Sequence, residues 1–284
     1  MKYYYAALLA VLFALFGCNT SVVRNSLSRA EGLMAESPDS AKTVLDSIKR
    51  TDLKNRALKA RFALLYSQAM DKCYIDTDND SLISVALNYY SKRGSNHEKA
   101  LAYYYNSAVA KNAKDIDKEV EYLVRAQEYA EKTDDAYLKG LIYSLLAQKY
   151  YMQFSFEEAL LLYEKSAKEF EKTGNLSNQL YAYSGIHNSL LCLDRAQESI
   201  PAARKALELA QKLNNINVGL INAIFVKPVD LELLKQLKNT KLIIIEEVMK
   251  IGSLASLIMQ YNFEYKLNMD IISYGIDDLY FNNR

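Results

Sequence analysis

The side chains that most often carry out chemistry are few in this chain, and most of them stand alone. Its 284 residues include only 2 His and 3 Cys. Neither Cys73 nor Cys192 belongs to a CxxC pair, and only His97 and His187 could supply imidazole. A zinc site needs several such ligands at close spacing, so we expect no metal site. We expect two buried thiols packed between helices, with a disulfide between them as the alternative.

Glu246 and Glu247 follow a continuous apolar run, Lys241 to Ile245, that is typical of a strand. Two carboxylates at the end of a strand could act as an acid and a base, but catalysis would need further groups around them. The chain contains no P-loop, GxGxxG, HExxH or nucleophile-elbow motif. We therefore interpret the pair as a solvated strand end and expect no catalytic residues.

Cys18 stands in a different context from the other two cysteines. It follows a continuous apolar stretch from Tyr5 to Phe16, which is too short to span a bilayer comfortably. Residues 15–18, Leu-Phe-Gly-Cys, resemble the lipobox of bacterial lipoprotein signal peptides, although Phe16 is bulkier than the usual residue. The resemblance implies cleavage before Cys18 and acylation of its thiol, which would anchor the chain to a membrane. An uncleaved anchor or an ordinary signal peptide is the alternative.

The overall composition is that of a folded chain. Half of the residues are hydrophobic, 24% are charged and the net charge is +1, as in ordered globular proteins. The chain lacks the basic excess of nucleic-acid-binding proteins, so we expect no nucleic-acid partner. Only 9 Gly and 3 Pro favour helices joined by short turns.

The composition changes near Leu213. Ile occurs 7 times in residues 1–213 and 11 times in 214–284, whereas Ala occurs only twice after Leu213. Segments this different are expected to have separate cores. We expect a mainly α protein, and its parts are a signal peptide at 1–17, a tether at 18–23, a helical part at 24–213 and an α/β part at 214–284.

A pattern of about 40 residues repeats in the helical part. One repeated column holds Tyr103, Tyr143 and Tyr183. Each copy contains two stretches with apolar residues every three or four positions, which predicts two antiparallel helices. Ser155 and Glu158 have the spacing of a capping box, and Gly174 allows a helix to end. The expected helix pairs are 24–35/39–49, 53–71/79–93, 97–112/116–133, 137–152/156–173 and 176–193/196–213.

The fourth copy resembles the motif of the tetratricopeptide repeat family. The matching residues, which we assign to packing, are Tyr143, Leu146, Ala147, Tyr150, Ala159, Tyr163 and Ser166. Asn79 and Glu119 depart from the motif, which usually has a small residue there. The resemblance implies an α-solenoid whose concave groove binds a peptide or an extended segment of a partner protein. Tyr104, Tyr105 and Tyr181 are weaker candidates for residues of that groove.

The last part alternates strands with helices. Strand-like runs at 218–223, 241–245 and 269–273 are separated by helical segments at 231–238 and after Gly252. This order predicts βαβ units and a small parallel sheet.

This part resembles the C-terminal, transketolase-type domain of the 1-deoxy-D-xylulose-5-phosphate synthase family. The residues that carry the resemblance are Asn222, Phe225, Lys227, Pro228, Asp230, Glu246, Glu247 and Gly252. Ile224 and Asp277 depart from the family pattern. In that family, thiamine diphosphate and a divalent metal such as Mg²⁺ are held by two preceding domains through a Gly-Asp-Gly motif, which this chain lacks. The resemblance therefore implies an incomplete segment that needs no cofactor and is inactive alone.

Three interpretations follow from these observations. The first is a non-catalytic protein-interaction scaffold, exported and anchored as a lipoprotein at the bacterial cell envelope. The second is a fragment of the synthase or a fusion to it, which would be cytoplasmic. The third is a join of two unrelated reading frames near residues 205–216, either natural or an artefact. Both parents would there carry a helix that ends in a segment like Ala206–Leu213.

Overall fold

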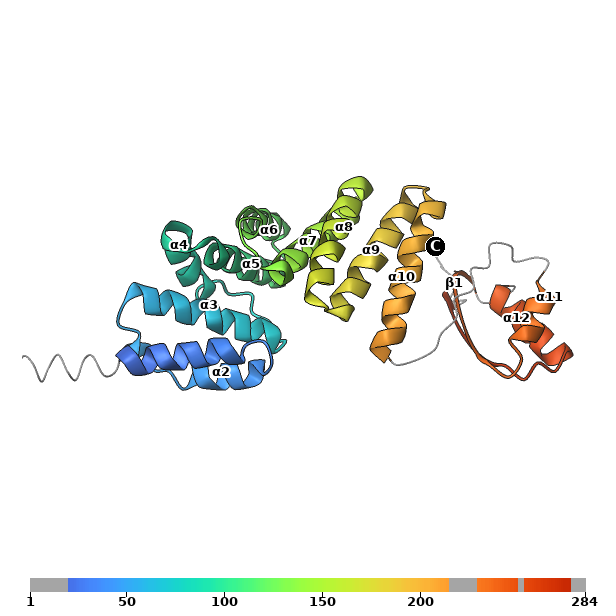
Figure 1. Ribbon diagram of the computed structural model, residues 1–284, viewed down its shortest axis with the longest axis horizontal. Coiled ribbons are helices and arrows are strands. Elements are labelled where there is room, and N and C mark those ends of the chain that lie inside the picture. The colour runs from blue at the N-terminus through green and yellow to red at the C-terminus, as the bar shows by residue number, and fades with distance from the viewer. Residues whose placement is uncertain (1–19, 215–228, 250–252, 277–284) are drawn as a thin grey trace, which may run out of the picture. The chain divides into compact units, whose positions relative to one another are not determined.

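The structure is a computed structural model that describes residues 20–214, 229–249 and 253–276. The chain divides into two compact units, Met1–Val218 and Gly219–Arg284. The first unit is helical, and the second combines helices with a parallel sheet (Figure 1). The expected fold class, a mainly α solenoid followed by a small α/β segment, is confirmed.

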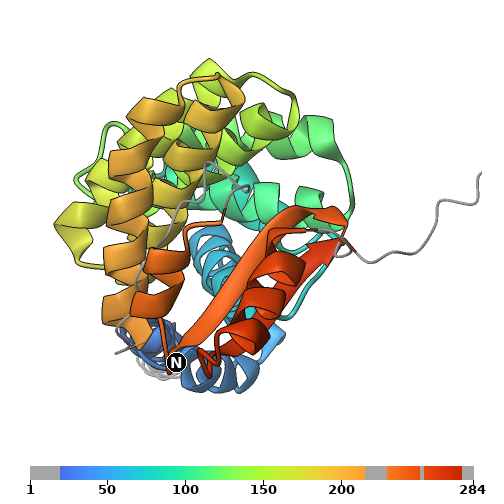
Figure 2. The same cartoon turned by 90° about the vertical axis from the view of Figure 1, so that its right-hand side faces the viewer.

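The first unit is built from antiparallel helix pairs. Residues 20–33 are helical. The elements that follow are α2 (Pro38–Asp46), the 3₁₀ turn η1 (Arg50–Asp52), α3 (Arg56–Lys72), α4 (Ile83–Arg93), α5 (Asn96–Asn112), α6 (Ile116–Ala130), α7 (Ala136–Met152), α8 (Phe156–Thr173), α9 (Leu176–Cys192) and α10 (Ala196–Asn214). These bounds agree with the expected pairs to within a few residues. Successive pairs are rotated relative to one another, so the stack twists (Figure 2).

The starts of the first helices follow the 40-residue period. Each N-cap side chain accepts a hydrogen bond from the backbone N–H three residues later, which satisfies a free donor at the helix start. These N-cap residues are Asn55, Ser95, Asp135 and Asn175. Ser95 also forms a complete capping box with Glu98.

The capping box expected at Ser155 and Glu158 was predicted wrongly, because the Ser155 side chain makes no capping bond. Asp115 stands one period earlier with nearly the same backbone, φ −89° and ψ 83° against φ −87° and ψ 73°. Its longer side chain reaches the N–H of Lys118 at 3.2 Å. The hydroxyl of serine is one bond too short for this conformation.

The turns inside the helix pairs also repeat. Their left-handed residues are Tyr74, Lys114, Phe154 and Asp194, with φ between 56° and 61°. The following residue returns its N–H to the carbonyl five residues earlier, as Asp115 does to Ala110 at 2.9 Å, which closes the end of the first helix. Gly174, with φ 69°, ends α8 as expected. The period is therefore a property of the backbone as well as of the side chains.

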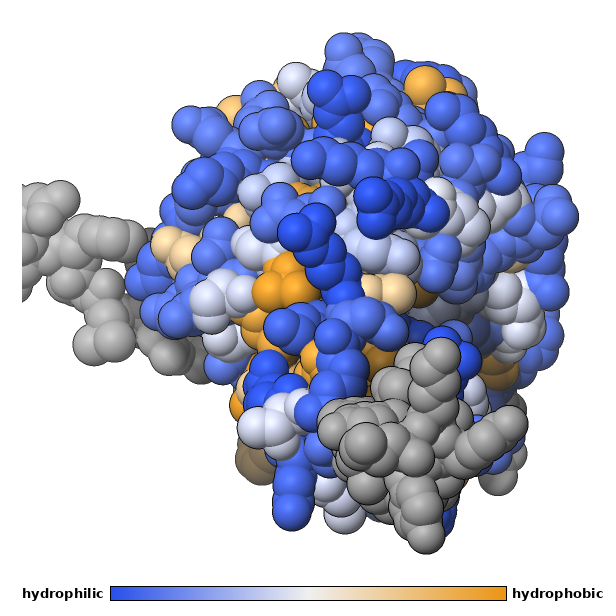
Figure 3. All heavy atoms as spheres, turned by 90° about the vertical axis from the view of Figure 1, so that its left-hand side faces the viewer, coloured by the Kyte–Doolittle hydropathy of each residue, from blue (hydrophilic) through white to orange (hydrophobic). Residues whose placement is uncertain are grey.

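Small residues let the paired helices approach closely. The Ser166 hydroxyl on α8 donates to the carbonyl oxygen of Gly140 at 2.9 Å and lies 2.6 Å from the hydroxyl of Ser144. A Cβ added to Gly140 would lie 2.7 Å from the ring of Phe170. The face shown in Figure 3 is largely hydrophilic, and hydrophobic residues are exposed there mainly in one central area. Most of the apolar side chains therefore pack inside the unit.

The second unit contains α11 (Leu231–Gln236), β1 (Lys241–Met249), α12 (Leu254–Glu264) and β2 (Asp270–Ile276). The two strands are parallel, with Lys241 opposite Asp270 and an irregularity between Ile245 and Met249. The helix α12 connects them as a crossover. The core residues of the second unit are Leu234, Ile244, Ala255, Ile258, Leu267 and Met269. The strand expected at 218–223 lies outside the described residues.

Candidate functional site

The residues of the tetratricopeptide motif lie between the helices. Tyr143, Leu146, Ala147, Ala159, Tyr163 and Ser166 are buried, and Tyr150 is half-buried. The hydroxyl of Tyr143 donates to Glu131 at 3.1 Å, and that of Tyr183 donates to Glu171 at 2.6 Å. These two bonds connect the tyrosine column to the glutamates one helix earlier. Burial, together with Glu171, raises the pKa of Tyr183 to about 12.

Glu119, one of the departures from the motif, has a partner. The residue is 3% exposed, and its carboxylate accepts a hydrogen bond from the Lys149 ammonium at 2.7 Å. This ion pair joins α6 to α7 and therefore links two neighbouring helix pairs. One period later Ala159 occupies the same column without a charge. The larger residue at 119 is thus matched by a cation on the next helix.

Tyr104 and Tyr105 do not line an open surface, so their assignment to a groove was wrong. They are 9% and 5% exposed and pack edge to face, with ring centres 5.0 Å apart. The helix α3 also packs against α5, which carries both residues. Burial raises the pKa of each hydroxyl. Tyr181, in contrast, is 44% exposed and contacts the ring of Tyr163.

The expectation of two buried thiols was also wrong. Cys73 is half-buried, Cys192 is exposed, and both are free. Each stands at the C-terminal end of a first helix, α3 or α9, where the chain leaves the packed layer. The Sγ of Cys192 lies 3.3 Å from the hydroxyl of Tyr151 on α7.

Exposed apolar side chains gather where α7 and α9 end. These parallel first helices of neighbouring pairs contact each other directly. Met152 is 67%, Phe154 80% and Leu191 46% exposed. We define the α7–α9 face as Tyr151, Met152, Phe154, Leu191 and Cys192. The rings of Tyr151 and Phe154 both contact Phe156, so the turn after α7 is fixed by aromatic packing.

Three of the polar residues near this face in the sequence are amides. Gln148 is half-buried, and Gln153 and Asn188 are exposed. The nearby cations Lys149 and Arg195 are paired with Glu119 and Glu198. Amide side chains both donate and accept hydrogen bonds, as a peptide backbone does. An apolar face with such a rim suits an uncharged, extended peptide segment.

In the second unit, the residues of the family resemblance hold no site that the structure describes. Asp230 caps α11 by accepting a hydrogen bond from the N–H of Leu233 at 3.0 Å. The strand β1 continues through Glu246 and Glu247 to Met249, so they are not at a strand end. The other residues of the resemblance, Asn222, Phe225, Lys227, Pro228 and Gly252, lie outside the described residues, as does Cys18.

Two kinds of feature are missing from the described ranges, 20–214, 229–249 and 253–276. They contain no group of three or more His, Cys, Asp or Glu that could hold a metal ion. None of the helices within them is long and apolar enough to cross a membrane.

Sequence comparisons concern the end of the chain. Residues 201–280 match the family described as "Transketolase, C-terminal domain". The 1-deoxy-D-xylulose-5-phosphate synthase of Campylobacter jejuni subsp. doylei is 39% identical over 83 residues, which are 28% of this chain and 13% of that enzyme. The synthase of Thermus thermophilus is 35% identical over 78 residues, or 12% of its length. The chain thus spans only a small part of these relatives.

Structural comparisons concern the helical unit. BtubC (BKLC) from P. vanneervenii aligns with a TM-score of 0.50 at 11% identity over 74% of this chain and 96% of its own. A single-residue variant of a kinesin light chain with nearly identical TPR-like repeats, from Podosopora anserina, gives 0.50 at 13% identity, over 69% and 98%. At these identities the likeness shows the fold alone, which is that of TPR-like repeats. The resemblance of the two parts to two different families is confirmed.

Proposed function

We propose that the helical unit is a non-catalytic scaffold that docks a segment of a partner protein on the α7–α9 face. The observation that carries this proposal is the exposure of Met152 and Leu191 on neighbouring first helices of a TPR-like stack, together with that of Phe154 in the turn after α7. Soluble proteins seldom expose several large apolar side chains together without using them for binding. Repeat stacks present such extended surfaces to partners.

The chemistry of the face restricts the partner segment. Apolar side chains of the partner segment would pack on Met152 and Leu191, and the amides of Gln148 and Asn188 would form hydrogen bonds with the backbone of that segment. The face itself carries no charged side chain that would attract a charged segment. We therefore infer an extended, uncharged peptide with at least two apolar anchors.

A peptide library displayed on phage tests this proposal. Selection against the chain should enrich peptides with apolar anchors, and Leu191→Glu should weaken their binding at least tenfold. Leu161→Glu is the matched control, because Leu161 is 55% exposed on α8, a helix that contributes no residue to this face. Equal loss in both variants, or no enrichment of apolar anchors, would contradict the proposal.

We also infer that the scaffold is exported and anchored through acylated Cys18 at the bacterial cell envelope. The apolar stretch and the lipobox-like residues before Cys18 support this inference. Two acyl chains would hold a protein at a membrane stably.

A second candidate function rests on the 39% identity of the last part to a synthase. In this alternative the chain is a fragment of 1-deoxy-D-xylulose-5-phosphate synthase or a fusion to it, cytoplasmic and inactive alone. Thiamine diphosphate and Mg²⁺ would be held by other domains of that enzyme. Turnover of a thiamine-dependent substrate when the chain is mixed with those other domains, and not by either part alone, would favour this alternative over the scaffold.

A further inference from the structure

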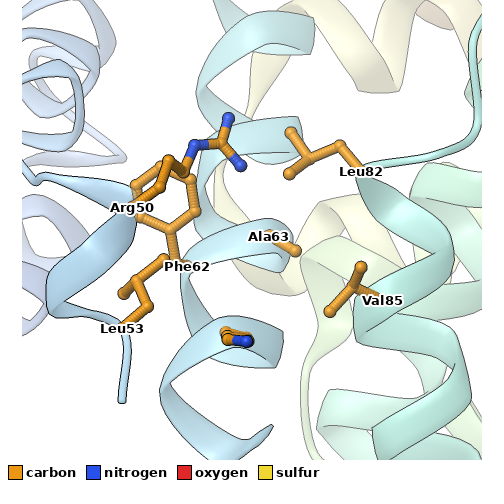
Figure 4. Close-up of a pocket in the computed structure, with 7 residues that line it drawn as sticks. Arg50, Leu53, Phe62, Ala63, Leu82 and Val85 are labelled. Atoms are coloured by element: carbon orange, nitrogen blue, oxygen red, sulfur yellow. The ribbon is translucent and has the colours of Figure 1, made fainter. Parts of the chain in front are cut away.

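A cavity of about 350 Å³ opens between η1, α3 and α4. Arg50 and Phe62 form one of its sides, Leu82 and Val85 of α4 the opposite side, and Ala63 lies between them (Figure 4). Lys59 also lines it. This volume is near the lower limit for small-ligand pockets, about 300–1,000 Å³, so it suits one aromatic side chain with a neighbouring group.

The repeat explains why the cavity exists. Ala63 stands one period before Tyr103 and two before Tyr143, in the tyrosine column. In the α7–α8 pair the Tyr143 ring is buried, with the Nζ of Lys165 at 5.6 Å from its centre. Val85, two periods before Lys165, lines the cavity at the corresponding place. The cavity therefore occupies the space that a tyrosine ring occupies in the later pairs.

The cavity is lined by positively charged side chains, whereas the tyrosine rings of the later pairs lie beside negatively charged ones. In the later pairs the tyrosine hydroxyls donate to the carboxylates of Glu131 and Glu171. Here the Arg50 guanidinium lies 4.6 Å from the centre of the Phe62 ring instead. Neither Arg50 nor Lys59 has an ion-pair partner within the part of the chain that the structure describes. The mouth of the cavity thus carries two cations available to an anion.

We propose that this cavity docks an aromatic residue of a partner protein that lies beside a carboxylate. The ring would take the place of the missing tyrosine and stack against Phe62 and Val85, and the carboxylate would pair with Arg50 and Lys59. The site is separate from the α7–α9 face and does not depend on it. The two sites also differ in chemistry, because only this one selects a negative charge.

The test uses a capped tripeptide, acetyl-Asp-Tyr-Asp-amide, titrated into the isotopically labelled chain and followed by amide NMR shifts. Shifts are expected at 50–63 and 82–85, and Arg50→Ala should weaken binding at least tenfold. Acetyl-Asp-Ala-Asp-amide and acetyl-Asn-Tyr-Asn-amide should each bind at least tenfold more weakly. Leu191→Glu should bind the tripeptide unchanged, which distinguishes this site from the α7–α9 face.

Ala63→Tyr tests the shape of the cavity. Inserting a ring at a buried alanine normally overpacks a core, but here it should leave the melting temperature unchanged or raise it and abolish tripeptide binding. Ala102→Tyr is the control, because Ala102 is fully buried on α5 and does not line this cavity, and it should lower the melting temperature. A lowered melting temperature for Ala63→Tyr would overturn the shape match. Unchanged binding to Arg50→Ala, or displacement of the tripeptide by decanoate at lower concentration, would overturn the proposed partner.

Discussion

The ion pair between Glu119 and Lys149 allows the energetics of the helix stack to be tested directly. Glu119→Ala would restore the small residue of the motif but leave the Lys149 ammonium without its partner. The Glu119 side chain is 4% and the Lys149 side chain 15% exposed, and their charged atoms are 2.7 Å apart. Removing one partner of a buried pair costs about 3–5 kcal/mol. Because Lys149 keeps some access to water, we expect the lower end, about 3 kcal/mol.

The double variant separates the unpaired charge from the loss of packing. Lys149→Met added to Glu119→Ala removes the stranded cation, and an apolar pair of this kind is often as stable as the ion pair it replaces. We expect the double variant to lie within about 1 kcal/mol of the original chain. Lys149→Met alone leaves the buried Glu119 carboxylate unpaired and should also cost about 3 kcal/mol. The coupling energy of the cycle should then be roughly 5 kcal/mol.

Urea unfolding followed by far-UV circular dichroism measures these differences. The signal reports mainly the first unit, which contains most of the helices. The slope of the unfolding free energy against urea concentration should be the same for all four proteins, which would show that each exposes the same amount of surface on unfolding. If Glu119→Ala alone were neutral, the buried pair would contribute nothing to the stack. If the double variant were as unstable as the single one, the cost would come from the cavity at residue 119.

Three further predictions concern other parts of the chain. Tyr74→Gly should stabilise the first unit by about 1 kcal/mol in the same unfolding assay, because Tyr74 has φ 56° and is 94% exposed. Lys168→Gly, in the middle of α8, should instead cost about 1 kcal/mol, and equal effects of the two glycines would contradict the backbone assignment. His97 lies 3.0 Å from Asp135, and mainly this hydrogen bond raises the pKa of His97 above 6.5 and lowers that of Asp135 below 3.8. The stabilisation from His97 should be fully present below about pH 6.5 and be lost as the pH rises through its folded pKa, whereas that from Asp135 should be lost in acid. His97→Gln should flatten the decline of melting temperature above this pH, and an unchanged profile would show that the pair does not contribute. Cys18→Ala should abolish incorporation of radiolabelled palmitate in bacterial cells, and continued labelling would place the acyl chain elsewhere.

The helix pairs could be predicted because their cause is local. Apolar residues every three or four positions and one glycine, Gly174, mark where helices run and end. The N-cap column of Asn55, Ser95, Asp135 and Asn175 was equally readable, since all four are capping residues, but it was overlooked. The left-handed turns gave no such signal. Tyr, Lys, Phe and Asp share the conformation there but no side-chain property.

The exposure of particular residues could not be predicted, because it depends on contacts between helix pairs. Tyr104 and Tyr105 are covered where α3 packs against α5, and no pattern within α5 indicates this. Glu119 departs from the motif, and its partner Lys149 lies on the next helix pair, so the repeat pattern alone does not explain it. The cavity beside Ala63 could be predicted only by aligning the repeats and by knowing that no other ring fills the place of the missing tyrosine.

The helix α10 connects the two resemblances. The match to the transketolase-type domain begins at residue 201, yet α10 packs as the second helix of the last pair, with Ala202 and Leu209 buried. Pro201 lies inside this helix, where proline removes a hydrogen bond, whereas proline is favoured in the first turn of a helix. A helix that began near residue 201 in one parent and was later extended by the solenoid would carry proline at that place. A single apolar stripe can cover either a helix or a sheet, so a helix of this kind would suit either parent.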